Sequence, residues 1–246
     1  KKLIFIVSAP RSGSTLLLSF LCGIPNSKIL YETKIFQDIY KADTYTDGLI
    51  DIAKYFDSFE EEIVIEKTPE HVFHLEDIEK LRDICKRDIY VIYIVRPPVP
   101  TILSLIKAAK DSPELFGDID LLGACEKYEE SLVVIYSQLI LKGNKPNTPT
   151  VKKYVYGKDI LEDLVKVSWY YNQTIIPHSF CISYRELIDN PYKIIKGLID
   201  SLYIDTNVQS LIDDRVINIH KYIPSIVNEK HHTNVLREVE EVDIER

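Results

Sequence analysis

Residues 3–18 read LIFIVSAPRSGSTLLL, and three segments of different character follow one another in this stretch. The β-rich run 3–7 predicts a buried strand, the small residues 8–15 predict a loop, and the leucine-rich run 16–21 predicts a helix. A loop between a strand and a helix directs backbone N–H groups and the positive end of the helix dipole toward one point. The stretch therefore predicts a site for an anion such as phosphate or sulfate.

The side chains of this loop also suit an anion. Arg11 adds a fixed positive charge that can pair with phosphate or sulfate oxygens. Hydroxyl donors come from Ser12, Ser14 and Thr15. Small residues also allow tight packing at a strand–turn–helix junction that holds no ligand, so the pattern alone leaves that alternative open.

The loop departs from the Walker A pattern G-x-x-x-x-G-K-[ST] of nucleotide triphosphatases. Gly13 and Thr15 fit that pattern, but Ser8 stands where the first glycine is required. Ser14 replaces the lysine that clamps the β- and γ-phosphates. Ordinary ATP or GTP hydrolysis is therefore disfavoured.

Length, composition and charge set limits on the class of protein. The chain has 246 residues, which suffices for one large α/β domain over residues 1–246. With 46% hydrophobic and 28% charged residues, the composition is typical of globular proteins. The net charge of −8 argues against a nucleic-acid partner. The sequence leaves the oligomeric state open.

Cysteine usage and hydropathy predict a cytoplasmic location. Cys22 and Cys181 lie in apolar segments and are expected to be buried thiols, which favours a reducing compartment. No apolar run reaches the roughly 18 residues that span a bilayer, and no signal peptide is apparent. The four cysteines show no metal-binding spacing, so we expect no metal site.

Strand-like and helical patterns alternate along the chain and predict an α/β fold. We expect a central parallel sheet with helices on both faces, a three-layer sandwich like that of P-loop NTPases. The expected strands are 3–7, 28–31, 63–65, 89–95 and 179–183. The expected helices are 16–21, 35–59 with a loop near 43–47, 72–86, 101–109, 126–141, 160–176 and 191–202.

Charged residues follow several of these strands. Glu32 follows the second strand, Glu66 and Lys67 follow the third, and Arg96 follows the fourth. The carboxyl ends of parallel strands share one edge of a sheet, where α/β proteins bind their ligands. Each of these residues alone could be a solvated loop residue, but together with the loop at 8–15 they predict a site at that edge.

Two of these motifs resemble those of sulfotransferases that use 3′-phosphoadenosine 5′-phosphosulfate. Residues 10–17, PRSGSTLL, resemble their 5′-phosphosulfate loop, which implies that Arg11, Ser12, Gly13, Ser14 and Thr15 bind the donor. Arg96, with Ser104 eight positions later, resembles their 3′-phosphate motif. The resemblance covers about residues 3–204 and implies this donor as co-substrate.

Three shorter segments also resemble this family. Residues 184–191, YRELIDNP, resemble the Y-E-D-L-x-x-D-P segment and place Tyr184 with the donor-binding residues. Residues 32–35, ETKI, resemble the E-T-R-I segment of protein-tyrosine sulfotransferases, which implies that Glu32 is the general base. Residues 66–69, EKTP, resemble the segment whose lysine, here Lys67, reaches the transferring sulfonate. The nearest branch is thus the bacterial and protein-tyrosine sulfotransferases.

The sequence also departs from the family pattern. Pro97-Pro98 replaces the usual Asp-Pro or Asp-Gly after the arginine, and the late basic loop that holds the 3′-phosphate in the cytosolic branch is not recognisable. Candidates for that duty are Lys221, Lys230 and Arg237. The acceptor stays open and could be a carbohydrate, a peptide tyrosine, a lipid or a small-molecule hydroxyl.

The resemblance implies in-line transfer of a sulfonate group to an acceptor hydroxyl, with no metal required. Arg11 and the loop would hold the 5′-phosphate, Lys67 would bridge the sulfonate, and Glu32 would accept the proton. A glutamate needs a raised pKa for that role. His71 and His74 are alternative bases, although surface histidines are the more ordinary interpretation. A P-loop small-molecule kinase and a non-catalytic nucleotide-binding recognition protein are the rival functions.

Overall fold

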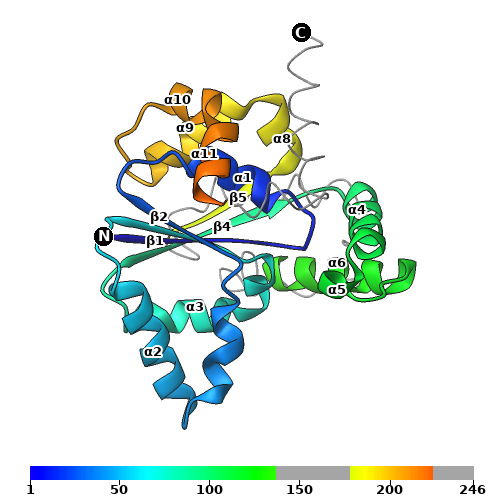
Figure 1. The fold of residues 1–246 in the computed structure, drawn as a ribbon, viewed down its shortest axis with the longest axis horizontal. Coiled ribbons are helices and arrows are strands. Elements are labelled where there is room, and N and C mark those ends of the chain that lie inside the picture. The colour runs from blue at the N-terminus through cyan, green and yellow to red at the C-terminus, as the bar shows by residue number, and fades with distance from the viewer. Residues whose placement is uncertain (137–177, 224–246) are drawn as a thin grey trace, which may run out of the picture.

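A five-stranded parallel sheet forms the centre of the protein, with strand order β2-β3-β1-β4-β5 (Figure 1). The computed structural model describes residues 1–136 and 178–223. The strands are β1 (Lys2–Ser8), β2 (Ser27–Tyr31), β3 (Ile63–Lys67), β4 (Asp88–Val95) and β5 (Ser179–Ser183). β1 lies between β3 and β4, so its backbone is hydrogen-bonded on both sides.

The helices form a layer on each face of the sheet. In chain order they are α1 (Ser14–Leu21), η1 (Ile35–Lys41), α2 (Tyr45–Asp57), η2 (Pro69–His74), α3 (Leu75–Leu81), α4 (Pro98–Asp111), α5 (Pro113–Phe116), α6 (Leu121–Tyr136), α8 (Tyr184–Asp189), α9 (Pro191–Ser201), α10 (Val208–Asp213) and α11 (Arg215–Tyr222). Figure 1 shows α1 and α8–α11 above the sheet, α2 and α3 below it, and α4–α6 beyond the end of β1.

Alternation along β1 divides the core in two. Ile4 and Ile6 pack into one cluster with α1 and α8–α11. Leu3, Phe5 and Val7 pack into the other, with α2, α3 and α6. Because successive side chains of a strand point to opposite faces, a continuous apolar run fills both clusters. This explains why the strand shows no polar alternation.

The predicted α/β sandwich is confirmed, and most differences concern element ends. β3 includes Glu66 and Lys67, which the sequence placed after the strand. The helix expected at 72–86 is instead the 3-10 helix η2 followed by α3, which ends at Leu81. α6 starts at Leu121 rather than at residue 126, and α5, α8, α10 and α11 were not predicted. The expected helix 160–176 lies outside the described residues.

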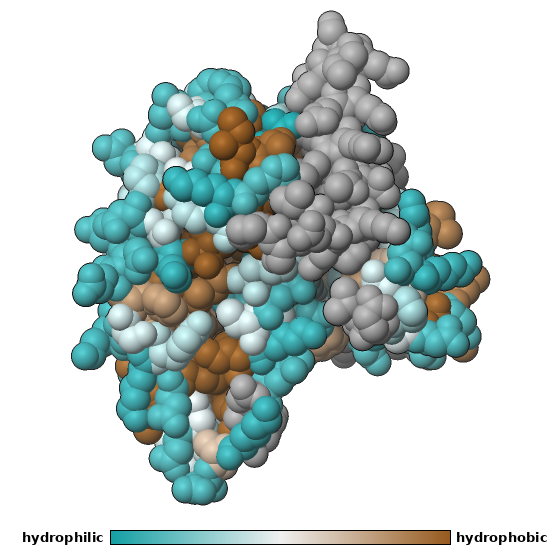
Figure 2. Space-filling model, in the orientation of Figure 1, coloured by the Kyte–Doolittle hydropathy of each residue, from teal (hydrophilic) through white to brown (hydrophobic). Residues whose placement is uncertain are grey.

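The surface gives two further observations. In the described residues, no helix combines the length and apolar character needed to cross a membrane. Brown surface lies over the α4–α6 region at the right of Figure 2. More than half exposed there are Val99, Leu103, Leu121 and Leu122.

Arg87 ties the end of α2 to the start of the sheet. Its side chain is only 3% exposed and donates to the carbonyl oxygens of Phe56, Phe59 and Glu61. Carbonyls at the end of a helix lack intrahelical hydrogen-bond donors. A buried cation there supplies these donors and interacts favourably with the negative end of the helix dipole.

We expect Arg87→Met to lower the free energy of unfolding by about 3 kcal/mol, because it leaves buried carbonyls without donors. Urea denaturation measures this change. Lys86→Met is the matched control, since the exposed Lys86 side chain should change stability by less than about 0.5 kcal/mol. Equal stability losses in the two variants would contradict the assignment.

Candidate functional site

The loop after β1 has the backbone of an anion cradle. Arg11 and Gly13 adopt left-handed conformations, with φ of 68° and 98°. The first hydrogen bond of α1 runs from the Leu17 N–H to the Gly13 carbonyl, at 3.0 Å. The amides that precede Leu17 at the start of α1 therefore have no carbonyl one turn earlier to bond, which is the usual way a helix start binds an anion.

Gly13 is required for packing as well as for its backbone conformation. A Cβ at this position would lie 2.3 Å from the ring of Tyr184. The ring of Tyr184, the first residue of α8, therefore lies directly against the loop. A side chain at position 13 would displace either the ring or the loop.

Four predicted donor-binding residues meet at this loop. Arg11 Nε donates to Ser104 Oγ of α4 at 3.3 Å. Arg96 Nη1 donates to the Arg11 carbonyl at 3.3 Å, and its guanidinium lies 4.4 Å from the centre of the Tyr184 ring. Tyr128 Oη fixes the backbone of the same arginine by donating to its carbonyl at 2.6 Å. The structure thus brings together residues that lie up to 173 positions apart in the sequence, from Arg11 to Tyr184.

The remaining loop residues are close to fully buried. Ser12 is 1% exposed and Ser14 is 4% exposed, whereas Thr15 is partly buried. The Ser8 hydroxyl at the end of β1 is buried and has no hydrogen-bond partner in the described part of the chain. A buried hydroxyl without a partner costs free energy unless a ligand supplies one. Together with Arg11 and Arg96 beside the loop, it fits a polyanionic ligand.

Lys67 and Glu32 form a second group on the same edge of the sheet. Parallel pairing places Tyr31 opposite Lys67, and the Glu32 N–H donates to the Lys67 carbonyl at 2.8 Å. Lys67 Nζ is 2.6 Å from Glu32 Oε1 and 4.6 Å from the centre of the Tyr31 ring. The lysine side chain is 2% exposed, so the carboxylate and the ring compensate its buried charge.

The ion pair sets the ionisation of Glu32. Burial raises the pKa of Glu32, but the charge and hydrogen bond of Lys67, with smaller contributions from Tyr31 and Lys34, together outweigh burial and lower the pKa from its ordinary value. A glutamate that acts as general base needs a raised pKa, and this ion pair shifts the pKa in the opposite direction. The physical reason is that Lys67, which the sequence assigned to the sulfonate, is paired with Glu32.

A buried carboxylate that the sequence left without a role lies next to this pair. Glu66 is 0% exposed and bonds to Thr33, Thr68 and His71. The one signal in the sequence is that Glu66 directly continues the apolar run 63–65, and β3 is buried along its whole length. The partners themselves come from two other turns and could not be inferred from that pattern.

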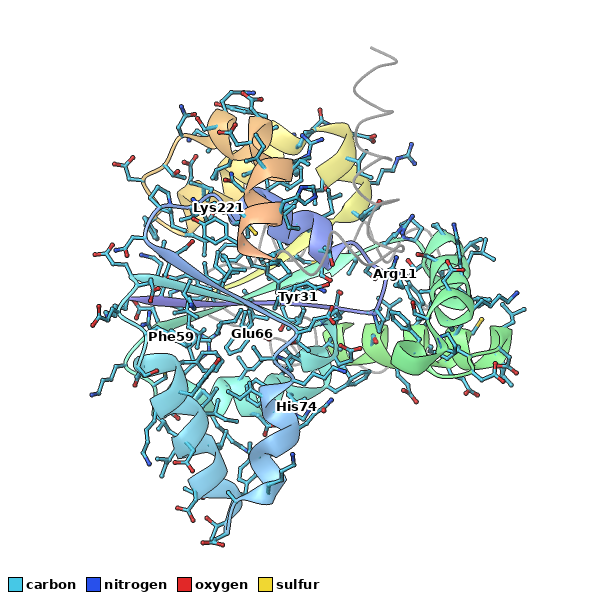
Figure 3. All side chains as sticks on the ribbon, viewed as in Figure 1. Arg11, Tyr31, Phe59, Glu66, His74 and Lys221 are labelled. Carbon is cyan, nitrogen blue, oxygen red and sulfur yellow. The ribbon has the colours of Figure 1, made fainter. Side chains whose placement is uncertain are left out.

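The two candidate histidines lie on the α2–α3 side of the sheet. His71 is buried, which corrects the expectation of a surface residue, because the end of β3 brings its ring against the core ring of Phe36 at 4.8 Å. His74 bonds to Asp77 at 2.9 Å and stacks on Phe36 at 5.4 Å. Figure 3 shows His74 well separated from Arg11.

Of the three candidates in the tail, Lys221 lies within the described residues. Lys221 is exposed near the end of α11 and lies far from Arg11 in Figure 3. Lys230 and Arg237 lie outside the described residues. Within residues 1–136 and 178–223, no group of three or more His, Cys, Asp or Glu side chains has an arrangement that could hold a metal ion.

Comparison with known proteins gave one family. The family model described as "Sulfotransferase domain" matches residues 1–234. A comparison with curated proteins gave no match.

Several solved structures of sulfotransferases are similar to this chain. The sulfotransferase domain of the Synechococcus PCC 7002 olefin synthase is 17% identical, with 87% of this chain and 77% of that chain covered and a TM-score of 0.53. A sulfotransferase from Alicyclobacillus acidocaldarius is 14% identical, with 96% of each chain covered and a TM-score of 0.50. Mouse sulfotransferase SULT7A1 complexed with PAP is 18% identical, with 90% of this chain and 66% of that chain covered and a TM-score of 0.45. The chain thus spans just under two thirds of the mouse protein.

We expect Lys67→Met to raise the pKa of Glu32, because the cation that favours the carboxylate is removed. In the unsubstituted protein, the pair stabilises the fold above the ordinary glutamate pKa, and this contribution is lost as the pH falls through the lowered value. Carbon NMR titration of the Glu32 carboxyl, assigned with Glu32→Gln, measures the shift. Lys34→Met is the control and should raise the pKa less, since Lys34 is exposed. A pKa unchanged in Lys67→Met would contradict the ion pair.

Proposed function

The chain belongs to the sulfotransferase family, and we propose that it transfers a sulfonate group from 3′-phosphoadenosine 5′-phosphosulfate to an acceptor hydroxyl. The observation that carries the proposal is the meeting of Arg11, Ser104, Arg96 and Tyr184 at the loop after β1. These residues come from the three segments that resemble the donor-binding motifs of the family. Their arrangement supports one nucleotide held by two phosphate groups.

In this proposal the donor is bound at two points. The loop amides, Arg11 and the hydroxyls of Ser14 and Thr15 hold the 5′-phosphate at the start of α1. Arg96 and Ser104 hold the ribose 3′-phosphate. The hydrogen bond between Arg11 and Ser104 links the two points and sets the spacing between them. Tyr184 fixes the plane of the Arg96 guanidinium.

In this proposal, Lys67 acts before Glu32, because the two residues are paired until the donor binds. When donor is bound, Lys67 turns from Glu32 to the sulfonate oxygens and the bridging oxygen, where negative charge develops. Glu32 then loses the cation that lowers its pKa and becomes a better base. The acceptor oxygen attacks sulfur, its proton passes to Glu32, and the bond between sulfur and the phosphate oxygen breaks. The products are a sulfate ester and adenosine 3′,5′-bisphosphate.

We also propose an acceptor class and a cellular location for the protein. The acceptor carries a hydroxyl and is a small molecule, a carbohydrate or a peptide. The side chains of Cys22 and Cys181 are both buried, as expected for thiols of a reducing compartment such as the cytoplasm.

Isothermal titration and a transfer assay test the function. We expect adenosine 3′,5′-bisphosphate to bind without added metal, and Mg·ATP to bind weakly or not at all. Transfer from radiolabelled donor is measured against a panel of sugars, phenols, tyrosine peptides and lipids, with Lys67→Ala as the inactive control. Tight binding of Mg·ATP without binding of the bisphosphate would favour the kinase. Bisphosphate binding without transfer to any acceptor would favour a recognition protein.

We expect Arg96→Ala to raise the dissociation constant of adenosine 3′,5′-bisphosphate by about 10- to 100-fold, because a charge-assisted contact to phosphate is lost. At saturating donor, kcat should change by less than about threefold, since Arg96 is not assigned to the reacting atoms. Arg185→Ala, on the same helix as Tyr184, is the control. The Arg185 side chain is exposed and lies 3.5 Å from Asp189, so its removal should leave the bisphosphate affinity unchanged. An unchanged bisphosphate affinity in Arg96→Ala would overturn the 3′-phosphate assignment.

A further inference from the structure

Glu66 lies beneath the catalytic pair, on the opposite face of the sheet. Successive residues of β3 point to opposite faces, so Glu66 and the adjacent Lys67 diverge. Figure 3 shows Glu66 on the side of α2 and α3. Its side chain is 0% exposed, so it cannot contact donor or acceptor from solvent. Any influence on the reaction must pass through the residues it binds.

The carboxylate joins the two turns that carry the catalytic residues. Oε1 accepts hydrogen bonds from Thr33 Oγ1 at 2.9 Å and from Thr68 Oγ1 at 2.5 Å. Thr33 directly follows Glu32, and Thr68 directly follows Lys67. One oxygen atom thus joins the turn that follows β2 to the turn that follows β3.

The other oxygen is fixed from the core. His71 Nδ1 lies 2.9 Å from Glu66 Oε2, and the His71 ring packs against Phe36 and Phe5, with centroids 4.8 and 6.3 Å apart. A buried carboxylate without donors would be strongly disfavoured, and these three bonds satisfy it. The rings leave the histidine little freedom, so the carboxylate is held in one orientation.

The turn after β2 needs such a tie. Glu32 and Lys34 have positive φ values of 47° and 52°, which are unfavourable for residues with a side chain. Such conformations persist when the surrounding structure enforces them. The bond between Thr33 and Glu66 lies between these two residues and supplies that constraint on the far face of the sheet.

We propose that Glu66 is a positioning residue, which holds Glu32 and Lys67 at the mutual geometry required for sulfonate transfer. The proposal rests on the proposed function. Lys67 must approach the sulfonate while Glu32 faces the acceptor hydroxyl, and a displacement of about 1 Å can lower a rate by about a hundredfold. The residues tied to Glu66 are separate from those assigned to the 5′- and 3′-phosphates, so donor affinity should not depend on it.

Three variants test the tie. Thr33→Val and Thr68→Val each remove one hydroxyl and keep the branched shape. Glu66→Gln keeps the volume but removes the negative charge and replaces one of the two accepting oxygens with an NH2 donor. Asp77→Asn is the matched control, because Asp77 is also a buried carboxylate in the same layer, and its hydrogen bonds are to Tyr45 and His74 rather than to Thr33 or Thr68.

Four measurements separate positioning from stability: kcat, bisphosphate affinity, melting temperature and hydrogen exchange. We expect each threonine variant and Glu66→Gln to lower kcat at least about tenfold, with the dissociation constant of adenosine 3′,5′-bisphosphate changed by less than about twofold. Asp77→Asn should lower the melting temperature without this loss of kcat. Hydrogen exchange of the amides in residues 33–35 and 68–71 should accelerate in Glu66→Gln and remain unchanged in Asp77→Asn.

The two proposals fail in different ways. Unchanged exchange in both segments of Glu66→Gln, or kcat losses equal to those of Asp77→Asn, would overturn the positioning role. An unsubstituted protein that transfers sulfonate to no acceptor would overturn the proposed function. The exchange measurement would then still decide whether Glu66 orders the two turns.

Discussion

The parallel pairing of β1 between β3 and β4 is the constraint on which the site depends. Ile6 lies opposite both Lys67 and Ile92, so the ends of the three strands lie at one edge of the sheet. β2 pairs with β3 and adds Glu32 to the same edge. The hydrogen-bond register thereby converts distant positions in the sequence into one charged edge, and the helix α1 begins there with its amides directed outward.

The electrostatics of this edge favour an anionic ligand. Arg11, Arg96 and Lys67 bring positive charge to a partly buried region, and Glu32 is the carboxylate that pairs with it. A buried lysine requires a negative partner, because desolvation of its charge is costly. The same requirement allows a sulfonate group to replace Glu32 as the partner of Lys67. In the proposed mechanism, this exchange of partners frees the Glu32 carboxylate for proton transfer.

The sequence predicted what local pattern encodes, and it failed where distant contacts decide. All five strands were located within two residues at each end, because β-branched apolar runs have few alternatives. The segment 72–86 was expected to be one helix, yet it divides into η2, which ends at His74, and α3, which begins at Leu75. His74 stacks on Phe36 and bonds to Asp77 at this division. His71 was expected at the surface for the same reason, since helical spacing gives no information about what covers a residue.

The sequence by itself determined the loop after β1, the residues proposed to bind an anion there and the family to which the chain belongs. These follow from residues close together in the chain, where spacing fixes geometry. Only the tertiary structure decided that Arg11 reaches Ser104, that Lys67 is paired with Glu32, and that Glu66 joins the two catalytic turns from the far face. Those contacts depend on strand order and on which face each side chain occupies, and both are set by packing of the whole sheet rather than by any local segment.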